Sequence, residues 1–349
     1  MDFWQRPFTD FGLTGLDGGK GGKYLVVGPG QEIPVTAKDY FVVHSRTFNF
    51  SYFYRTLDKE PAKAEKIATS VKAYPYKERD TPRTTRYLRT VPGGKLTLAI
   101  QPQGMRYWEL LADSINKEPV EDRDRFFLAM LRPLGIKKGK PFQPDEKQKK
   151  ILIEATVVGE AMAKVNSFDK RFPGSRYRDD ANWDYVLMLD PDQDLPDYSQ
   201  LDERAAYFYE AVATSKGMVS KTPGVGQAYL GTYRDRFGNA FDGSKTYRIR
   251  IPANPPAEDF WSLTIYDLDT RVLIQNEQQV ADRSSRMDLI TNADGTVDLY
   301  VGPKPPKGFE KNWIQSLPGK SWFAYIRLYG PKEEYFTKSW PLPDFERVE

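Results

Sequence analysis

The hydrophobic period of this chain changes along its length, and that change limits the possible folds more than any other feature. Between residues 60 and 216 apolar residues recur at helical spacing, as with Ile67 and Ala68 after Pro61. From Gly226 onward the period becomes two, which is typical of strands with one buried face. We therefore predict an α+β chain with a helical middle and a β-rich C-terminal part.

Two strand signals precede the helical part, at Tyr24–Val27 and Tyr40–Thr47. The stretch DGGKGGK at residues 17–23 invites comparison with a phosphate-binding loop. Such a loop follows a strand and ends in Gly-Lys-Ser/Thr, whereas here Lys20 precedes glycine, Lys23 precedes tyrosine, and the strand comes after the loop. We interpret the stretch as a structural connection.

The helical spacing predicts a succession of helices in the middle of the chain. They begin at Pro61 and run over Met105–Lys117, Glu121–Leu131, Asp145 to about Val165, and Leu201–Lys216, with a strand at Lys95–Ile100. Residues 151–163 are apolar nearly all round, so we expect a buried central helix. Its Glu154 and Glu160 are expected to pair with arginine; the alternative is a general acid or base with a raised pKa.

The C-terminal part predicts an antiparallel β-sandwich of jelly-roll type. The expected strands are Ala228–Arg234, Lys245–Ile251, Phe260–Leu268, Arg286–Thr291, Thr296–Val301 and Trp322–Tyr329. The link Asn292-Ala-Asp-Gly295 predicts a hairpin, because Asp-Gly supplies the positive φ angles of a tight turn.

The chain has no cysteine and a single histidine, which excludes most metal and nucleophile chemistry. Disulfides, thiolate ligands and cysteine nucleophiles are impossible, and zinc or non-haem iron sites need more than His44 alone. Residues 190–194 have the carboxylate spacing of a calcium loop, but Leu195 and Leu201 stand where glycine and glutamate are required. We expect no metal and no cofactor.

The charge balance argues against a polyanion partner, since 51 basic residues face 48 acidic ones. The locally basic stretch from Val71 to Lys95 contains three prolines, and we interpret it as an extended loop and not as a nucleic-acid site. No apolar run is long enough to span a membrane, and the start MDFWQRPFTD lacks the apolar stretch of an export signal. The localisation stays open, and a cytoplasmic location is the default expectation for the chain as written.

Several segments resemble proteins that pair the domains of unknown function 1254 and 1214. The segments are GLDGGKGGKYLVVGP (15–29), IKKGKPFQPDEKQKKILIEA (136–155), FDGSKTYRIRIPANPPAEDFWSLTIYDLDTR (241–271), NADGTVDLYVGPKPP (292–306), KNWIQSLPGK (311–320) and WFAYIRLYGP (322–331). They follow one another in order over nearly the whole chain.

The resemblance implies three parts. These are a partial, immunoglobulin-like β domain (1–59), a mainly helical domain (60–225) and a jelly-roll-like β domain (226–349). Similar proteins often carry an export signal and further strands ahead of the first domain, so we expect that domain to be a remnant here. An uncovered sheet edge in such a remnant favours a partner chain.

Alternation along the C-terminal strands sorts their side chains by face and suggests a site. If the strands are neighbours, one face carries Arg, Tyr, Ser and Thr. Such a face suits a carboxylate or a sugar, but we favour an ordinary solvated outer face. The ligand-binding candidates are Tyr266, Asp267, Arg286, Asn292, Arg327 and Tyr329. For Asp267 we favour a structural clamp that pairs with a buried arginine.

These observations predict a protein that binds a small or glycan-like ligand between its domains. Hydrolysis or lysis by carboxylate acid–base chemistry is a possible extension, and the sequence leaves open whether the protein is an enzyme. The competing hypothesis is a non-catalytic assembly module that oligomerises through its β domains. Under either hypothesis we expect a homo-oligomer.

Overall fold

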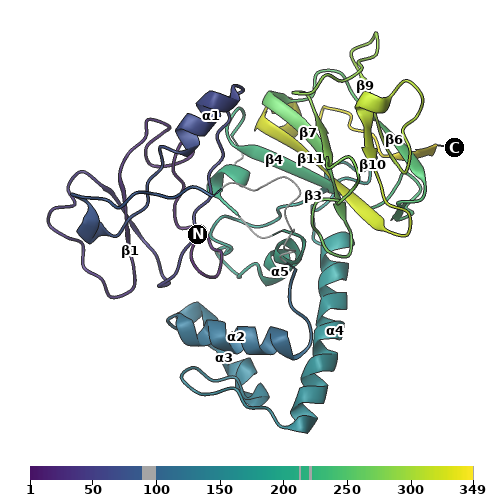
Figure 1. The fold of residues 1–349 in the computed structure, drawn as a ribbon. Coiled ribbons are helices and arrows are strands. Elements are labelled where there is room, and N and C mark those ends of the chain that lie inside the picture. The colour runs from purple at the N-terminus through teal and green to yellow at the C-terminus, as the bar shows by residue number, and fades with distance from the viewer. Residues whose placement is uncertain (89–99, 212–213, 220–221, 349) are drawn as a thin grey trace.

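The computed structural model describes residues 1–88, 100–211, 214–219 and 222–348 (Figure 1). It confirms an α+β chain, with six α-helices and several sheets among these residues. The helices are α1 (Pro61–Ala68), α2 (Met105–Lys117), α3 (Arg125–Leu131), α4 (Glu146–Phe168), α5 (Leu201–Glu210) and α6 (Glu333–Phe336). Among the described helices, none combines the length and apolar character needed to cross a bilayer.

Two sheets make up the C-terminal part, and most of their pairings are antiparallel. The larger sheet has the order β3 (Asp184–Tyr185), β4 (Gln227–Thr232), β11 (Ser321–Pro331), β7 (Ala257–Asp267), β8 (Asp282–Ser284), with β5 (Phe241–Asp242) also on β11. The smaller has the order β10 (Trp313–Gln315), β9 (Val297–Gly302), β6 (Thr246–Ile251), β12 (Glu346–Val348). The pair β10–β9 is parallel. The jelly-roll topology stays a prediction.

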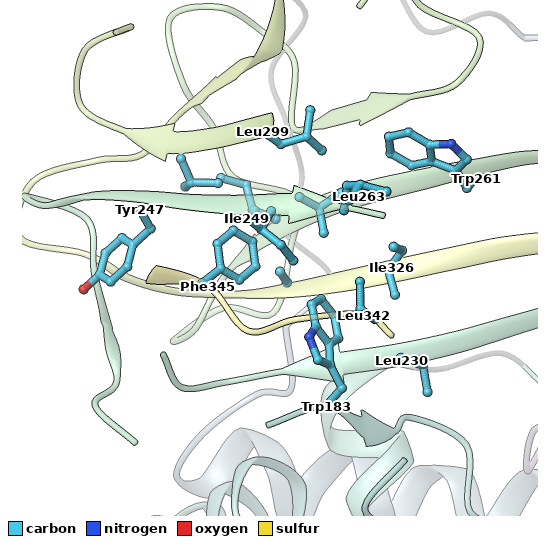
Figure 2. Packing of buried hydrophobic residues seen from close by; sticks show 14 of the residues in the cluster. Trp183, Leu230, Tyr247, Ile249, Trp261, Leu263, Leu299, Ile326, Leu342 and Phe345 are labelled. Atoms are coloured by element: carbon cyan, nitrogen blue, oxygen red, sulfur yellow. The ribbon is translucent and has the colours of Figure 1, made fainter. Parts of the chain in front are cut away.

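The main hydrophobic core lies between these two sheets (Figure 2). Ile249 of β6 and Leu299 of β9 meet Leu263 of β7 and Ile326 of β11, and all four are fully buried. They occupy alternate positions of their strands, as the period of two requires. Trp183 joins this core from beside β3, so a segment ahead of residue 226 packs with the C-terminal sheets.

The opposite face of the larger sheet is also buried, because the helical part covers it. Phe323 and Tyr325 of β11 pack with Tyr207 of α5 and with Phe168 at the end of α4. The prediction of a solvated outer face was therefore wrong. Strand alternation separates two faces but does not say which of them water reaches.

Helix α4 begins where the sequence predicts, but its burial is different. The Asp145 carboxylate caps the helix by accepting a hydrogen bond from the Gln148 backbone N–H, and the Gln148 side-chain oxygen accepts one from the Asp145 backbone N–H. Only Leu152 and Ser167 are buried, so the expected central, buried helix was wrong. In Figure 1 the helix projects away from the sheets, with α2 and α3 beside it.

The N-terminal part holds one small sheet, in which β1 (Tyr24–Val27) and β2 (Phe41–His44) are parallel. The preceding glycine loop is organised by Asp17, whose carboxylate accepts hydrogen bonds from the backbones of Gly12 and Gly21. The loop is therefore a structural connection that enters β1, as predicted. The immunoglobulin-like character of this part stays a prediction.

Two further strand predictions need comment. Residues 286–291 do not form a strand, so the predicted hairpin lacks its first strand. A turn is present, in which the Gly295 backbone N–H donates to the Asn292 carbonyl, and Gly295, though not Asp294, has a positive φ, of +80°. The predicted strand at Lys95–Ile100 lies outside the described residues, apart from Ile100. The predicted helix to Lys216 ends earlier, at Glu210.

Candidate functional site

The candidate site lies on the face of the larger sheet that the helical part covers. Arg327 of β11 stands opposite Tyr229 of β4 on one side and Ser262 of β7 on the other. Side chains opposite one another in a sheet share a face, and so do alternate residues of a strand. Tyr325 and Tyr329 therefore flank Arg327 on this face.

The guanidinium of Arg327 is held by neutral hydroxyl groups. It donates to Thr264 Oγ1 at 2.6 Å and to the phenol oxygen of Tyr266. It also lies 5.6 to 5.7 Å from the ring centroids of Tyr229, Tyr266 and Tyr325. We call Arg327 and these three tyrosines, together with Tyr207 and Tyr329, the arginine–tyrosine cluster.

A column of stacked groups continues from the cluster to the surface. Phe260 of β7 stacks on Tyr329 with their ring centroids 3.9 Å apart, and Arg286 lies 4.0 Å above the Phe260 ring. On the other side, Arg55 from the N-terminal part donates to the Tyr329 phenol oxygen. Arg286 in turn donates to the backbone oxygen of Leu57. The N-terminal part thus lies against the column.

These three arginines share one property: within the described residues, none of Arg55, Arg286 and Arg327 forms an ion pair with a carboxylate. Arg327 remains only partly exposed, while Arg55 and Arg286 are exposed. Burial raises the pKa of the Tyr229 phenol to about 12, while Arg327 and Arg55 pull it down. Both guanidinium groups therefore act on one phenol, and the cluster carries a net positive charge.

Asp282 of β8 is one carboxyl on this face, and Asp184 of β3, opposite Gly231, is another. Asp282 stands opposite Thr264 in the sheet and forms no side-chain hydrogen bond or ion pair within the described part of the chain. Burial raises the pKa of the Asp282 carboxyl, and the Arg283 and Arg327 guanidinium groups partly offset the effect. Asp282 was not among the sequence candidates, since nothing in the alternation pattern distinguishes it.

A second polar group lies on the same face, nearer the end of α4. Lys170 forms an ion pair with Glu210 at 3.0 Å, and the Tyr233 phenol contacts both. Burial raises the pKa of Tyr233 well above its ordinary value, and the Glu210 charge adds to the increase. The two charges are satisfied by each other, which is typical of a structural pair. The sequence analysis missed all three residues, which come from separate segments.

The structure brings together four of the six sequence candidates and places the other two elsewhere. Tyr266, Arg327 and Tyr329 belong to the arginine–tyrosine cluster, and Arg286 joins it through Phe260. Asn292 instead donates to Thr296 Oγ1 and to Asp298 Oδ2, in the turn before β9 of the smaller sheet.

Asp267 ends β7 on the opposite face from Tyr266. Its carboxylate accepts hydrogen bonds from the backbone and hydroxyl of Thr270 at 2.8 and 2.9 Å, and it lies 3.5 Å from Lys320. We expected Asp267 to pair with a buried arginine, and that prediction was wrong because the nearby cation is a lysine. Asp267 fixes a turn, and the charge near it is a half-exposed lysine.

The remaining polar candidates have ordinary roles. Glu160 lies 3.7 Å from Arg271 and accepts a hydrogen bond from Tyr209, so it ties α4 to α5 and to the end of β7, while Glu154 is exposed. Among the described residues, no three histidine, aspartate or glutamate side chains form a group able to hold a metal. In residues 190–194, which have the carboxylate spacing of a calcium loop, the Asp190 side chain accepts a hydrogen bond from the Asp192 backbone N–H.

Two surface hollows lie away from the cluster. One of about 330 Å³ is bounded by α2 and the residues before α4, including Met105 and Phe142. The other, of about 190 Å³, lies beside Phe127 of α3 and Arg204 of α5. Neither includes a residue of the arginine–tyrosine cluster.

Two family models match this chain. Residues 1–75 match DUF1254 and residues 226–333 match DUF1214, both described as proteins of unknown function. No curated protein matches the chain. The C-terminal match spans β4 to β11 and therefore most of the cluster, whereas the N-terminal match contributes Arg55.

Two solved structures are distantly similar to this chain. The VPA0106 protein from Vibrio parahaemolyticus is 17% identical at a TM-score of 0.47, with 96% of this chain and 77% of that chain covered. A putative uncharacterized protein from Burkholderia cenocepacia is 12% identical at a TM-score of 0.27, with 69% and 51% covered. Neither likeness carries an inference about function.

Proposed function

We propose that this protein, which combines segments of DUF1254 and DUF1214, binds a small organic anion at Arg327. The observation that carries the proposal is a partly buried guanidinium without a carboxylate partner among the described residues. Removing a cation from water is costly unless an anion compensates it, and hydroxyl groups alone compensate it poorly. A ligand carboxylate would complete the site through paired hydrogen bonds to the guanidinium.

The surrounding groups favour a ring-bearing carboxylate, such as a sugar acid. Tyrosine rings provide flat apolar surfaces against which a pyranose or aromatic ring packs, and their hydroxyls offer hydrogen bonds. Arg55 and Arg286 add positive charge at the exposed edge, which would draw an anion inward. Asp282 is the carboxyl that an acid–base step would use, since its raised pKa suits proton transfer.

The experiment is a comparison of glucuronate with glucose by calorimetry and thermal shift. We expect glucuronate to bind and to raise the melting temperature, and glucose to do neither. Arg327→Lys keeps the charge but loses the paired donors, so it should weaken glucuronate binding about tenfold or more. Arg250→Lys is the matched control, because Arg250 lies on the smaller sheet and pairs with Asp298 at 2.9 Å.

Two further variants test whether a loss of binding comes from the site and not from a folding defect. Arg55→Met and Arg286→Met change exposed side chains, so their stability should stay close to that of the parent. Each should still weaken glucuronate binding, mainly through a slower association that depends on salt. If neither glucuronate nor simpler carboxylates such as benzoate bind at millimolar concentration, the proposal fails.

The assembly-module hypothesis has a different observation in its favour. Large apolar side chains are exposed on α4 and also in the N-terminal β part, where Phe48, Phe50 and Tyr52 occupy alternate positions. An interface through the β domains therefore stays a prediction.

A further inference from the structure

The longest helix of the chain presents an apolar stripe to solvent. Ile151, Val158, Met162 and Val165 of α4 are 49% to 64% exposed, and Ala155 is exposed between them. Their spacing is four, three, four and three residues. This is the spacing of the core positions in a left-handed pair of helices, where the period is 3.5. We call these five residues the α4 seam.

The seam lies well away from the face by which α4 joins the rest of the molecule. That attached face includes Leu152, whose backbone oxygen accepts a hydrogen bond from Trp108, and Thr156, which accepts one from the Gly104 backbone. At 100° per residue, Leu152 and Thr156 point more than 90° away from the middle of the seam. In Figure 1 the side of α4 away from α2 has no neighbouring element.

We propose that the seam pairs with the seam of a second copy of this chain, in antiparallel orientation about Val158. In a parallel pair, Lys147, which continues the seam four residues ahead of Ile151, would face its copy and repel it. In an antiparallel pair Lys147 lies beside the C-terminal end of the partner helix, where the Asp169 carboxylate is half-exposed and carries negative charge. Ile151 then packs against the partner's Val165, and Val158 packs against the partner's Val158.

The size of the contact sets the expected affinity. The helix has 23 residues and is about 34 Å long. A stable interface commonly buries about 800 Å² on each partner, and one helix seam provides less. We therefore expect a dissociation constant in the micromolar range and a monomer–dimer equilibrium that depends on concentration.

Sedimentation equilibrium of the full chain tests the pairing. The parent should dimerise as its concentration rises through the micromolar range, whereas Val158→Glu and Met162→Glu should remain monomeric with unchanged helix content by circular dichroism. Val157→Glu is the matched control, because Val157 is 68% exposed on the same helix but lies off the seam, so it should dimerise like the parent. If the parent protein stays monomeric at a concentration about 100-fold above the expected micromolar dissociation constant, the proposal is wrong.

Cysteine cross-linking tests the orientation, and the absence of native cysteine makes each result specific. Val158→Cys should form a disulfide-linked dimer under mild oxidation, while Ile151→Cys alone and Val165→Cys alone should not. A mixture of the last two proteins should give a mixed dimer. Efficient cross-linking of Ile151→Cys to itself would contradict the antiparallel arrangement.

Another occupant of the seam would give a different pattern. If monomeric protein binds vesicles containing anionic lipid, and Val158→Glu abolishes that binding, the seam is a membrane contact and the proposal is wrong. If Val157→Glu weakens vesicle binding as much as Val158→Glu does, that binding does not depend on the seam. The sedimentation result then decides whether the seam pairs with a second copy.

Discussion

Lys170 Nζ lies 3.0 Å from the Glu210 carboxylate, and both side chains are almost completely buried. The same ammonium donates to Tyr233 at 2.6 Å and to the Ser167 backbone oxygen at 2.7 Å. The pair therefore joins the end of α4, the end of α5 and the segment after β4. Its position makes it the polar centre of the contact between the helical part and the larger sheet.

Removal of one partner of this pair should strongly destabilise the protein. Glu210→Gln leaves a buried ammonium without its counter-charge, which we expect to lower the free energy of unfolding by about 3–5 kcal/mol. Urea denaturation measures the change. Asp269→Asn is the control, because its pair with Lys164 is largely exposed and should contribute at most about 1 kcal/mol. Equal effects of the two substitutions would contradict a structural role for Glu210.

Asp267→Asn should have a modest effect. The amide keeps an acceptor oxygen for Thr270 and loses only the attraction of a half-exposed lysine, Lys320, so the loss should be about 1 kcal/mol. Asp267→Ala removes the acceptor and should cost about 1–3 kcal/mol. Thermal unfolding of both variants checks the order, and glucuronate binding should survive in each. If Asp267→Asn is stable but no longer binds glucuronate, Asp267 is part of the binding site after all.

Asp282 should make stability fall as pH rises from acid toward neutral. Its folded-state pKa is raised above the ordinary value of 3.8, so the folded state binds the proton more tightly than the unfolded state. The stabilising contribution of the protonated carboxyl is therefore complete below pH 3.8 and is lost as pH passes the folded pKa. Asp282→Asn should be more stable than the parent at neutral pH, with the difference vanishing at low pH.

Asp288, whose pKa is shifted in the opposite direction, is the control for Asp282. The Lys311 ammonium, through a hydrogen bond, lowers the pKa of the exposed Asp288 carboxyl. Any contribution from Asp288 is therefore present at neutral pH and is lost as pH falls. Asp288→Asn should not gain stability at neutral pH, and urea denaturation from pH 3 to pH 8 compares the two variants. A gain in both would show that burial of Asp282 is not the cause.

Gly295→Val should damage the turn before β9. Gly295 has a φ of +80°, a conformation that a β-branched residue rarely adopts, and its Cβ would also meet Ala253 at 3.4 Å. We expect a loss of about 1–3 kcal/mol, measured by thermal unfolding. Gly308→Val tests whether such strain matters equally elsewhere, since φ there is +84° but nothing lies within 4 Å. A fully stable Gly295→Val protein would mean that the turn rearranges.

Local patterns in the sequence determined much of the secondary structure. Helix α2 has the predicted bounds, α4 begins after its predicted cap, and β4, β6, β7, β9 and β11 lie within a few residues of their predicted positions. These elements depend on spacing, capping and turn residues, which act over a few neighbours. The expected strand at residues 286–291 failed because an alternating pattern does not ensure a partner strand to accept its hydrogen bonds.

Burial and the make-up of the site depended on tertiary structure. The apolar middle of α4 suggested a buried helix, but burial depends on which elements surround it. Of the described residues of α4 only Leu152 and Ser167 are buried, and in Figure 1 no described element lies beside the helix on the side away from α2. The sheet face with Arg327 suggested contact with water, but the helical part covers it.

The same limit applies to the residues around Arg327. The sequence identified Arg327, Tyr266 and Tyr329 by their alternation within strands. It gave no sign of Asp282, Arg55 or the pair Lys170–Glu210, because these side chains meet only when segments far apart in the chain pack together. Spacing along the chain specifies a face of a helix or strand, whereas long-range packing decides what that face meets.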